Sequence, residues 1–521
     1  MLITEILSRN GRMYADEIAL VERDPAANRR LEISWRSFDR EASRFANALM
    51  AQGVKRGDRV LHLMMNSIEW LPCYFGILRA GAIAAPLNFR FEADILQRCN
   101  EIAEARVLLF GPEFIERIAA VKPALDQTIR HYVYIGPDRD CPAFAESYAD
   151  FVSGVTAEPP GVALEITDNA ALYFTSGTTG LPKAVSLTHR NLEHACYVEN
   201  QHHRQTHEDN FLCIPPLYHT GAKMHWLGNF VVGARAVLLK GARPEWILEA
   251  VSAEQATIVW LLVPWAHDIL IAWENGEIDF GRYRLDQWRL MHIGAQPVPP
   301  NLIKAWRKLF PHHEYDTNYG LTESSGPGCI HLGVGNSHKI GAIGKPGFDW
   351  EARIVDQQGN RLPTGQAGEL LVKGPGVMQG YYRNPQATAE TIHDGWLHTG
   401  DIARLDAEGF IWLVDRKKDL IITGGENVSP LEVEHYFLEH PSIQDIAVIG
   451  TPDQRLGELV TAIIQLKEGR SLTEQELMAY AERLPRYKRP RRFYFDNVPR
   501  NATGKIEKPL LRERYGVVVE M

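Results

Sequence analysis

The chain has 521 residues, of which 45% are hydrophobic, so it is long enough to bury a large core and to form more than one domain. Its net charge of -9 gives no basic footprint for nucleic acid or for an anionic membrane, so any anionic ligand must be held by local structure. These properties exclude a short disordered protein and favour a small-molecule partner over a nucleic acid.

The start of the chain predicts a cytoplasmic protein without integral membrane contact. It lacks the apolar segment of a signal peptide, and no stretch approaches the roughly 20 apolar residues needed to cross a bilayer. The cysteines show neither a CxxC pair nor histidine-rich spacing, so we expect reduced packing residues rather than a zinc site or disulfides. They are Cys73, Cys99, Cys141, Cys196, Cys213 and Cys329.

Short apolar runs alternate with helical patterns along the first part of the chain. Residues 34–52 have the period of a helix, and residues 59–64, 106–110 and 171–174 read as buried strands. This alternation is typical of an α/β fold. We find no repeat or low-complexity linker before residue 415, which favours one large body.

Residues 173–188 form the most informative segment, in which an expected strand runs into a loop of hydroxyls and glycines that ends at Lys183. Glycines let the backbone approach an anion, hydroxyls donate hydrogen bonds and the lysine supplies charge, so the loop suits phosphate groups. Taken alone, it is equally compatible with a surface turn. It is not a Walker A loop, because Lys183 follows Pro182 and a strand pattern comes next. The candidate phosphate-binding residues are Thr175, Ser176, Gly177, Thr178, Thr179 and Lys183.

A second unit is expected to begin near Arg416. There the pattern changes to the charged turn DRKKD, then to an apolar triplet and a glycine-containing loop that leads into a helical pattern at residues 431–440. We therefore expect a large α/β body of several subdomains at residues 1–415 and a small, mobile α+β lid domain at residues 416–521.

Five segments, in order, resemble the adenylate-forming superfamily of acyl-CoA synthetases, 4-coumarate-CoA ligases, luciferases and nonribosomal adenylation domains. They are YFTSGTTGLPK (173–183), NYGLTE (318–323), GWLHTGD (395–401), DRKKDLIITGGENVSPLEVE (415–434) and NATGKI (501–506). The matches span nearly the whole chain. The resemblance implies the acyl-CoA synthetase branch, an enzyme that uses ATP and Mg²⁺ to join a carboxylic acid to coenzyme A through an acyl adenylate, with release of pyrophosphate.

The resemblance also implies roles for residues beyond the phosphate loop. Tyr319 would stack on the adenine ring, Glu323 would hold Mg²⁺, and Thr322 would donate to the α-phosphate. Asp401 would accept both ribose hydroxyls, and Arg416 would donate to the ribose or a phosphate. The other residues expected along the nucleotide are Gly294, Ala295, Gln296, Asn318 and Gly320.

Catalysis and domain movement are expected to depend on a few more residues. Lys505 is the expected catalytic residue, because a positioned ammonium lowers the repulsion when a carboxylate attacks the α-phosphorus. Lys418 falls at the hinge position, and Gly424 and Gly425 fit a loop that the lid brings to the pantetheine tunnel. His219 matches a histidine beside the acyl pocket, where a functional and a structural role both remain open.

The acyl group is left open among aromatic, alicyclic and medium-chain acids. Trp226 and Met224 favour a modest apolar pocket, whereas Lys223 and His225 either meet a second polar group or face solvent. Asn318 stands where many relatives carry glycine, which changes the expected floor of the pocket. Ala184 likewise replaces the glycine usual after the phosphate-loop lysine, without loss of a catalytic side chain. A homodimer is also left open.

Two rival functions come from different classes. A stand-alone adenylation enzyme that loads an amino or aryl acid onto a carrier protein needs an acidic anchor for an amino acid's ammonium, and residues 211–228 offer none. A catalytically inactive nucleotide-binding regulator would have lost Lys505, Glu323 or the phosphate loop, and all are present. The acid–CoA ligase is therefore the favoured interpretation.

Overall fold

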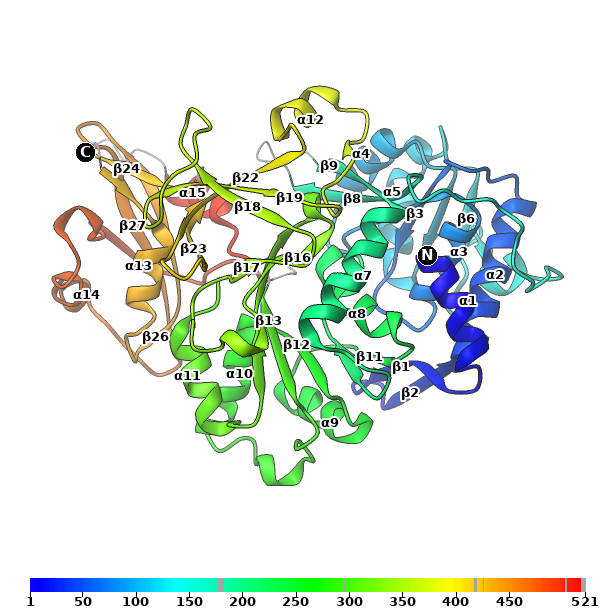
Figure 1. Ribbon diagram of the computed structural model, residues 1–521, viewed down its shortest axis with the longest axis horizontal. Helices are drawn as coiled ribbons and strands as arrows, with labels where there is room; N and C mark the ends of the chain where they lie inside the picture. The colour runs from blue at the N-terminus through cyan, green and yellow to red at the C-terminus, as the bar shows by residue number, and fades with distance from the viewer. Residues whose placement is uncertain (177–181, 295–296, 417–418, 425, 502–503, 517–521) are drawn as a thin grey trace.

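The computed structural model describes residues 1–176, 182–294, 297–416, 419–424, 426–501 and 504–516, and it has the mixed α/β architecture expected from the sequence (Figure 1). Its strands form two large sheets, two smaller sheets and a C-terminal sheet. None of the described helices combines the length and the apolar composition needed to cross a bilayer. All six cysteines carry free thiols, as expected.

The two large sheets are mostly parallel. One has the order β14-β13-β12-β10-β11-β1-β2 and the other the order β20-β9-β8-β4-β3-β5-β6-β7. The strands of the first are β1 (Ile18–Asp24), β2 (Arg29–Ser34), β10 (Asn210–Cys213), β11 (Arg235–Leu239), β12 (Ile258–Leu262), β13 (Leu290–Gly294) and β14 (Glu314–Asp316). Those of the second are β3 (Arg59–Leu63), β4 (Ile83–Pro86), β5 (Val107–Phe110), β6 (His131–Tyr134), β7 (Glu146–Ser147), β8 (Asn169–Ser176), β9 (Pro182–Thr188) and β20 (Gly380–Tyr381). The strands predicted at 59–64, 106–110 and 171–174 are thus confirmed.

The smaller sheets are antiparallel, and they follow all strands of the large sheets except β20 in the chain. One contains β15 (Asn318–Leu321), β16 (Gly326–His331) and β17 (Lys345–Pro346), and the other contains β18 (Glu351–Val355), β19 (Ala367–Lys373), β21 (Ile392–His393), β22 (Trp396–Leu405) and β23 (Ile411–Arg416). The C-terminal sheet lies at the opposite side of the molecule from the N-terminal helices (Figure 1). Its strands are β24 (Ile421–Thr423), β25 (Glu426–Val428), β26 (Ile443–Asp453), β27 (Gly457–Leu466) and β28 (Arg492–Phe495).

The helices begin and end close to the sequence signals. Ser34 caps the helix predicted at residues 34–52 by accepting a hydrogen bond from the Ser37 backbone N–H. The helix predicted at residues 431–440 ends earlier, at Phe437. The helices are α1 (Ile3–Met13), α2 (Trp35–Ala51), α3 (Trp70–Arg79), α4 (Ala93–Ala103), α5 (Ile115–Leu125), α6 (Tyr148–Phe151), α7 (His189–His203), α8 (Thr220–Val231), α9 (Pro244–Glu254), α10 (Val263–Glu274), α11 (Pro300–Leu309), α12 (Pro385–Thr391), α13 (Pro430–Phe437), α14 (Glu474–Ala481) and α15 (Lys508–Tyr515).

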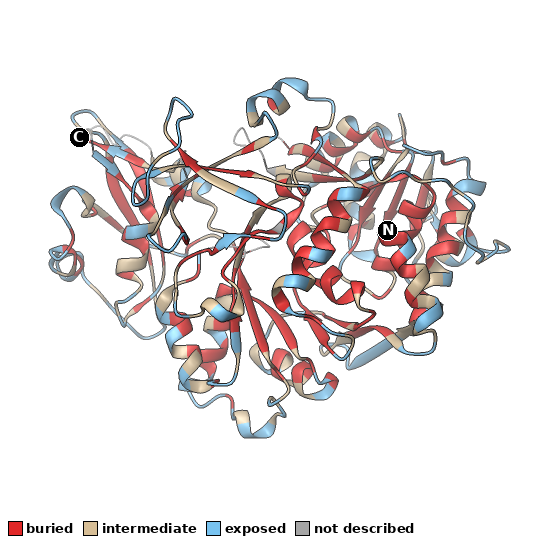
Figure 2. Ribbon diagram, in the orientation of Figure 1, coloured by how far each residue is buried: buried red, intermediate tan, exposed pale blue. Residues whose placement is uncertain are grey.

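Helices α7 and α8 pack against each other and join the two large sheets. One continuous hydrophobic cluster contains residues of both helices and of strands from both sheets, and these elements are mostly buried (Figure 2). A core of this size is what the length and composition of the chain predict. The ends of the strands around α7 and α8 are therefore held in fixed relative positions.

The passage to the C-terminal sheet is anchored by Asp415. Its Oδ2 accepts hydrogen bonds from Ser429 Oγ (2.9 Å) and from the Leu431 backbone N–H (2.9 Å), at the start of α13. Strand β23 ends at Arg416, and the next sheet begins at Ile421. We propose that the domain boundary lies at residues 415/416, where the chain leaves the sheet of β23 for the C-terminal sheet.

Candidate functional site

The phosphate-loop segment is an antiparallel pair of strands. Thr175 in β8 pairs with Lys183 in β9, so the chain returns at once after the loop, as the strand pattern after Lys183 predicted. Lys183 is partly exposed, and its Nζ lies 4.8 Å from the centre of the Tyr381 ring. Gly177, Thr178 and Thr179 lie outside the described residues. Thr175 and Lys183 therefore flank the loop on which the phosphate prediction rests.

Tyr381 connects Lys183 to Glu323. The Tyr381 hydroxyl donates a hydrogen bond to Glu323 Oε1 (2.9 Å), while its ring faces the lysine ammonium. Glu323 belongs to a single helical turn, Thr322–Ser324, directly after β15. Its other carboxylate oxygen is a hard ligand of the kind that Mg²⁺ prefers. The sequence reasoning missed Tyr381, because the run Gly380-Tyr381-Tyr382 carries no charge or spacing that marks it.

Tyr319, Asp401 and Arg416 meet at one buried carboxylate. The Tyr319 hydroxyl donates to Asp401 Oδ2 (2.5 Å), and Arg416 Nε lies 3.1 Å from Asp401 Oδ1. Asp401 is 4% exposed, whereas the Arg416 side chain is 44% exposed. Both oxygens of Asp401 thus have a partner in this structure. Each carboxylate oxygen can accept more than one hydrogen bond, so these contacts leave capacity for the ribose hydroxyls.

His219 caps the N-terminus of α8 and is uncharged. Its Nδ1 accepts a hydrogen bond from the Gly221 backbone N–H (3.1 Å), which leaves Nε2–H as a donor. Burial, together with the charge of nearby Lys505, lowers the pKa of His219 to about 3. The charge of Lys505 thus acts on His219 although the two residues are 286 positions apart in the sequence (505 minus 219).

Lys505 is held by a tight turn. The Lys505 backbone N–H donates to Asn501 Oδ1 (3.0 Å), and the Asn501 N–H donates to the Lys505 carbonyl (2.9 Å). Gly504 has φ 79°, a conformation that suits glycine. These bonds join the two ends of the turn expected from NATGKI, whose residues Ala502 and Thr503 lie outside the described residues.

Several other predicted site residues have fixed positions. Gly294 ends β13, Asn318 and Gly320 are in β15, and the Gly424 N–H donates to the Leu456 carbonyl. Ala295, Gln296, Lys418 and Gly425 lie outside the described residues, as does the predicted adenine edge that Ala295 and Gln296 would form.

Trp226 does not line an open pocket, and the side chain of Met224, the other residue behind the prediction of an apolar pocket, lies outside the described residues. Trp226 is fully buried in the core against Phe38, Phe75 and Phe230. These partners come from α2, α3 and the end of α8, so packing distant in sequence decides the position of the ring.

Lys223 does not face solvent. Its Nζ lies 4.5 Å from the Tyr74 ring centre and 4.2 Å from that of Tyr173, with no hydrogen-bond partner among the described atoms. Burial lowers the pKa of Lys223 well below its usual range. Its aromatic surroundings make it part of the interior.

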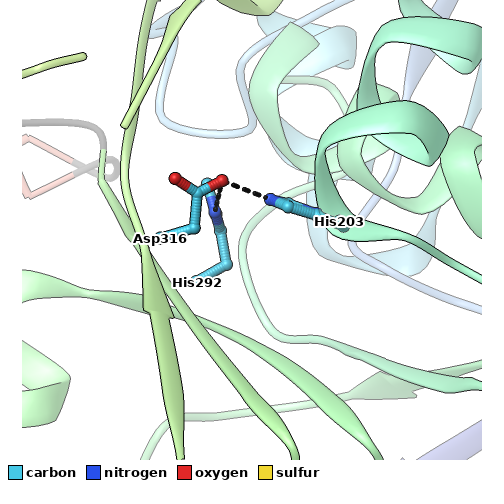
Figure 3. A group of neighbouring side chains, drawn as sticks. All are labelled: His203, His292 and Asp316. Carbon is cyan, nitrogen blue, oxygen red and sulfur yellow. Dashed lines mark hydrogen bonds and ion pairs between the residues drawn. The ribbon is translucent and has the colours of Figure 1, made fainter. Parts of the chain in front are cut away.

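A second group of potential metal ligands lies deeper in the molecule. His203, His292 and Asp316 are fully buried and offer ligand atoms within 4.8 Å of one another (Figure 3). Asp316 Oδ2 already lies 3.0 Å from His203 Nε2. This group is separate from Glu323, the residue predicted to hold Mg²⁺.

The sequence matches the AMP-binding enzyme family over residues 7–382 and the AMP-binding enzyme C-terminal domain over residues 432–505. A feruloyl-CoA synthase from Amycolatopsis sp is 35% identical over 491 residues, which cover 93% of this chain and 94% of that protein. The 4-hydroxybutyrate–CoA ligase 2 of Metallosphaera sedula is 32% identical, over 97% of this chain and 93% of that protein.

Solved structures with the same fold include an anthranilate CoA ligase in complex with anthranoyl-AMP. It has a TM-score of 0.90 and 28% identity, and the match covers 99% of this chain and 97% of that one. ATP-bound MatB from Rhodopseudomonas palustris has a TM-score of 0.88 and 28% identity, with full coverage of both chains.

The two possible roles of His219 can be separated by substitution. His219→Asn keeps an N-cap acceptor, whereas His219→Ala removes it and should lower the free energy of unfolding by about 1 kcal/mol. We expect both variants to slow formation of the acyl adenylate at least about tenfold, the scale of one lost hydrogen bond to a charged group. Pyrophosphate release and denaturant unfolding measure the two effects. A full rate in His219→Asn would show that His219 serves only as a cap.

Proposed function

The chain belongs to the AMP-binding enzyme family, and from that membership we propose that it is an ATP-dependent acid–CoA ligase. The acid would attack the α-phosphorus of ATP with release of pyrophosphate, and the acyl group would then pass to the thiol of coenzyme A with release of AMP. The supporting observation is that Lys183 and Glu323 meet at Tyr381. A cation suited to phosphate and an oxygen ligand suited to Mg²⁺ therefore contact the same side chain.

Each residue of the site would have a separate task in the first half-reaction. Lys183 would hold the phosphates, and Glu323 would hold Mg²⁺, which neutralises phosphate charge when it is bound. Tyr319 and Asp401 would orient the nucleoside. Lys505 would steady the charge that develops as the carboxylate attacks, because a preorganised ammonium costs no reorganisation at that moment.

The second half-reaction would need the C-terminal unit to turn about the connection near Lys418. Lys505 would then leave the site, and the loop that contains Gly424 and Gly425 would approach the pantetheine tunnel, through which the thiol of coenzyme A would enter. Coenzyme A as the acceptor is supported by the names of two relatives, the feruloyl-CoA synthase and the 4-hydroxybutyrate–CoA ligase 2. The two names give different acids, so they support the ligase class and leave the acyl group open among aromatic, alicyclic and medium-chain acids.

The reaction class is tested by its products. ATP, Mg²⁺, coenzyme A and a panel of carboxylic acids should yield AMP and pyrophosphate in equal amounts, with strict dependence on Mg²⁺ or a similar hard cation. Chromatography of the nucleotides distinguishes AMP from ADP. Stoichiometric ADP would exclude adenylation.

Lys505→Ala should impair the first half-reaction alone. We expect acyl-adenylate formation to slow by about 10² or more, since one preorganised electrostatic donor commonly contributes roughly 3 kcal/mol of transition-state stabilisation. Thioester formation from presynthesised acyl adenylate and coenzyme A should keep the parent rate. An equal loss in both half-reactions would contradict a lid that carries Lys505 away.

Tyr381→Phe should raise the Mg²⁺ concentration needed for half-maximal adenylation by about tenfold, because a hydrogen bond to a charged group contributes about 1.5 kcal/mol. The phenyl ring keeps the contact with Lys183, so the change isolates the bond to Glu323. Tyr382→Phe, at the next position, is the matched control. If Tyr381→Phe and Tyr382→Phe needed the same Mg²⁺ concentration, the hydrogen bond from Tyr381 to Glu323 would not contribute to metal binding.

A further inference from the structure

Two carboxylates and four imidazoles are buried together beneath the candidate site, and the proposed reaction does not use them. They come from α7, α8, β13, β14 and β16, and each is at most 3% exposed. Figure 3 shows three of them. We call this group the buried ring; its members are Glu199, His203, His225, His292, Asp316 and His331.

The carboxylates of the buried ring are compensated by histidines. His203 lies 3.0 Å from Asp316 and 3.4 Å from Glu199, and His331 lies 3.4 Å from each of the same two carboxylates. Among the described residues, neither carboxylate has a lysine or arginine within ion-pair distance. Burial opposes protonation of His331, but the flanking carboxylates raise its pKa to about 9. The buried ring is thus a group of mutually compensating polar side chains inside the core.

The buried ring fixes the orientation of the Asn318 amide. The Gly221 carbonyl can only accept a hydrogen bond, and it lies 2.6 Å from His225 Nδ1, so Nδ1 carries the proton. Nε2 of the neutral His225 imidazole is then an acceptor. Asn318 Nδ2 is 2.9 Å from that Nε2 and 3.2 Å from Glu199 Oε1. Both amide hydrogens are therefore used. A flipped amide would turn its oxygen toward two acceptors, which is unfavourable.

Because Asn318 Nδ2 already donates both of its hydrogens, the only side-chain atom that Asn318 can offer to a ligand is the acceptor Oδ1. Among the described atoms, a Cβ built on Gly294 would lie 3.9 Å from both Asn318 O and Asn318 Oδ1, in ordinary van der Waals contact, so this oxygen faces the end of β13. Asn318 is partly exposed, whereas Glu199 and His225 are buried. Asn318 thus stands at the border between the buried ring and the candidate site.

The side chains of Asn318 and Tyr319 lie on opposite faces of β15. Neighbouring side chains in a strand point to opposite faces, and Tyr319 points to Asp401. Along α8, His225 lies six residues beyond His219, about 9 Å at the rise of an α-helix. His219 is the residue expected beside the acyl pocket, and Asn318 bonds to His225 at the other end of this stretch of α8.

We infer that the acid taken by this enzyme carries a hydroxyl or amino group at the end remote from its carboxyl, and that Asn318 Oδ1 accepts a hydrogen bond from it. The inference rests on the proposed ligase function. An acceptor that a bound acid shields from water without offering a donor costs free energy, so a site of this kind selects against acids that lack the donor. The unsubstituted alicyclic and medium-chain acids left open by the sequence are then the poorer substrates.

Matched acids test the inference on the intact enzyme. Benzoate, 4-hydroxybenzoate, 4-aminobenzoate and 4-methoxybenzoate form one set, and butyrate and 4-hydroxybutyrate form another. We expect kcat/KM for pyrophosphate release to be at least about tenfold higher for a hydroxy or amino acid than for its unsubstituted partner. The methyl ether is the control for size, because it adds an acceptor without a donor.

The outcomes separate this inference from the proposed function. Turnover of unsubstituted acids or of the ether as fast as the donor-bearing acids would overturn the inference and leave the ligase standing. Absence of pyrophosphate release with every acid would contradict both.

Two variants assign the selectivity to Asn318. Asn318→Leu replaces the amide by an apolar side chain of similar volume, and Asn318→Gly removes the side chain with less risk to folding. In both, the ratio of kcat/KM between donor-bearing and unsubstituted acids should fall toward one. Asn47→Leu, in α2, is the matched control and should keep the parent ratio. An unchanged ratio in Asn318→Gly would overturn the assignment, since a merely structural role changes the rates but not their ratio.

Discussion

The buried carboxylate of Asp401 is the constraint on which the site depends. A carboxylate removed from water must be bonded, and its partners here come from different parts of the fold: Tyr319 from one small sheet and Arg416 from the end of another. These two contacts fix β15 relative to β22 and β23. Because β15 runs directly into the turn that bears Glu323, the same constraint sets the position of the candidate metal ligand relative to Lys183 and Tyr381.

Local patterns in the sequence were sufficient to predict the elements that carry the site. The strand before the phosphate loop, the strand after Lys183 and the turn at Gly504 all follow from apolar periodicity and from glycine placement within a few residues. The resemblance then supplied the order of the segments. Neither kind of information could predict Tyr381, because its role arises only when β20 pairs with β9.

The errors in the prediction have the same origin. Trp226 and Lys223 were read from their neighbours in the sequence, but Trp226 packs on Phe38 and Phe75, and Lys223 is enclosed by Tyr74 and Tyr173. Glu199 was missed for the converse reason. The segment around His219 contains no acid, yet helix packing brings this carboxylate to Asn318 from α7. Side chains contributed by distant elements decide the polarity of a pocket.

The short connection after Asp415 has a kinetic consequence. Only four residues separate Arg416 from Ile421, so they can span at most about 18 Å between these two Cα atoms, and the C-terminal unit cannot diffuse away from the body. Any departure and return of Lys505 is therefore intramolecular, with an effective concentration on the order of millimolar that is set by this tether. The rate at which one molecule passes from adenylation to thiol transfer and back is then independent of how dilute the enzyme is.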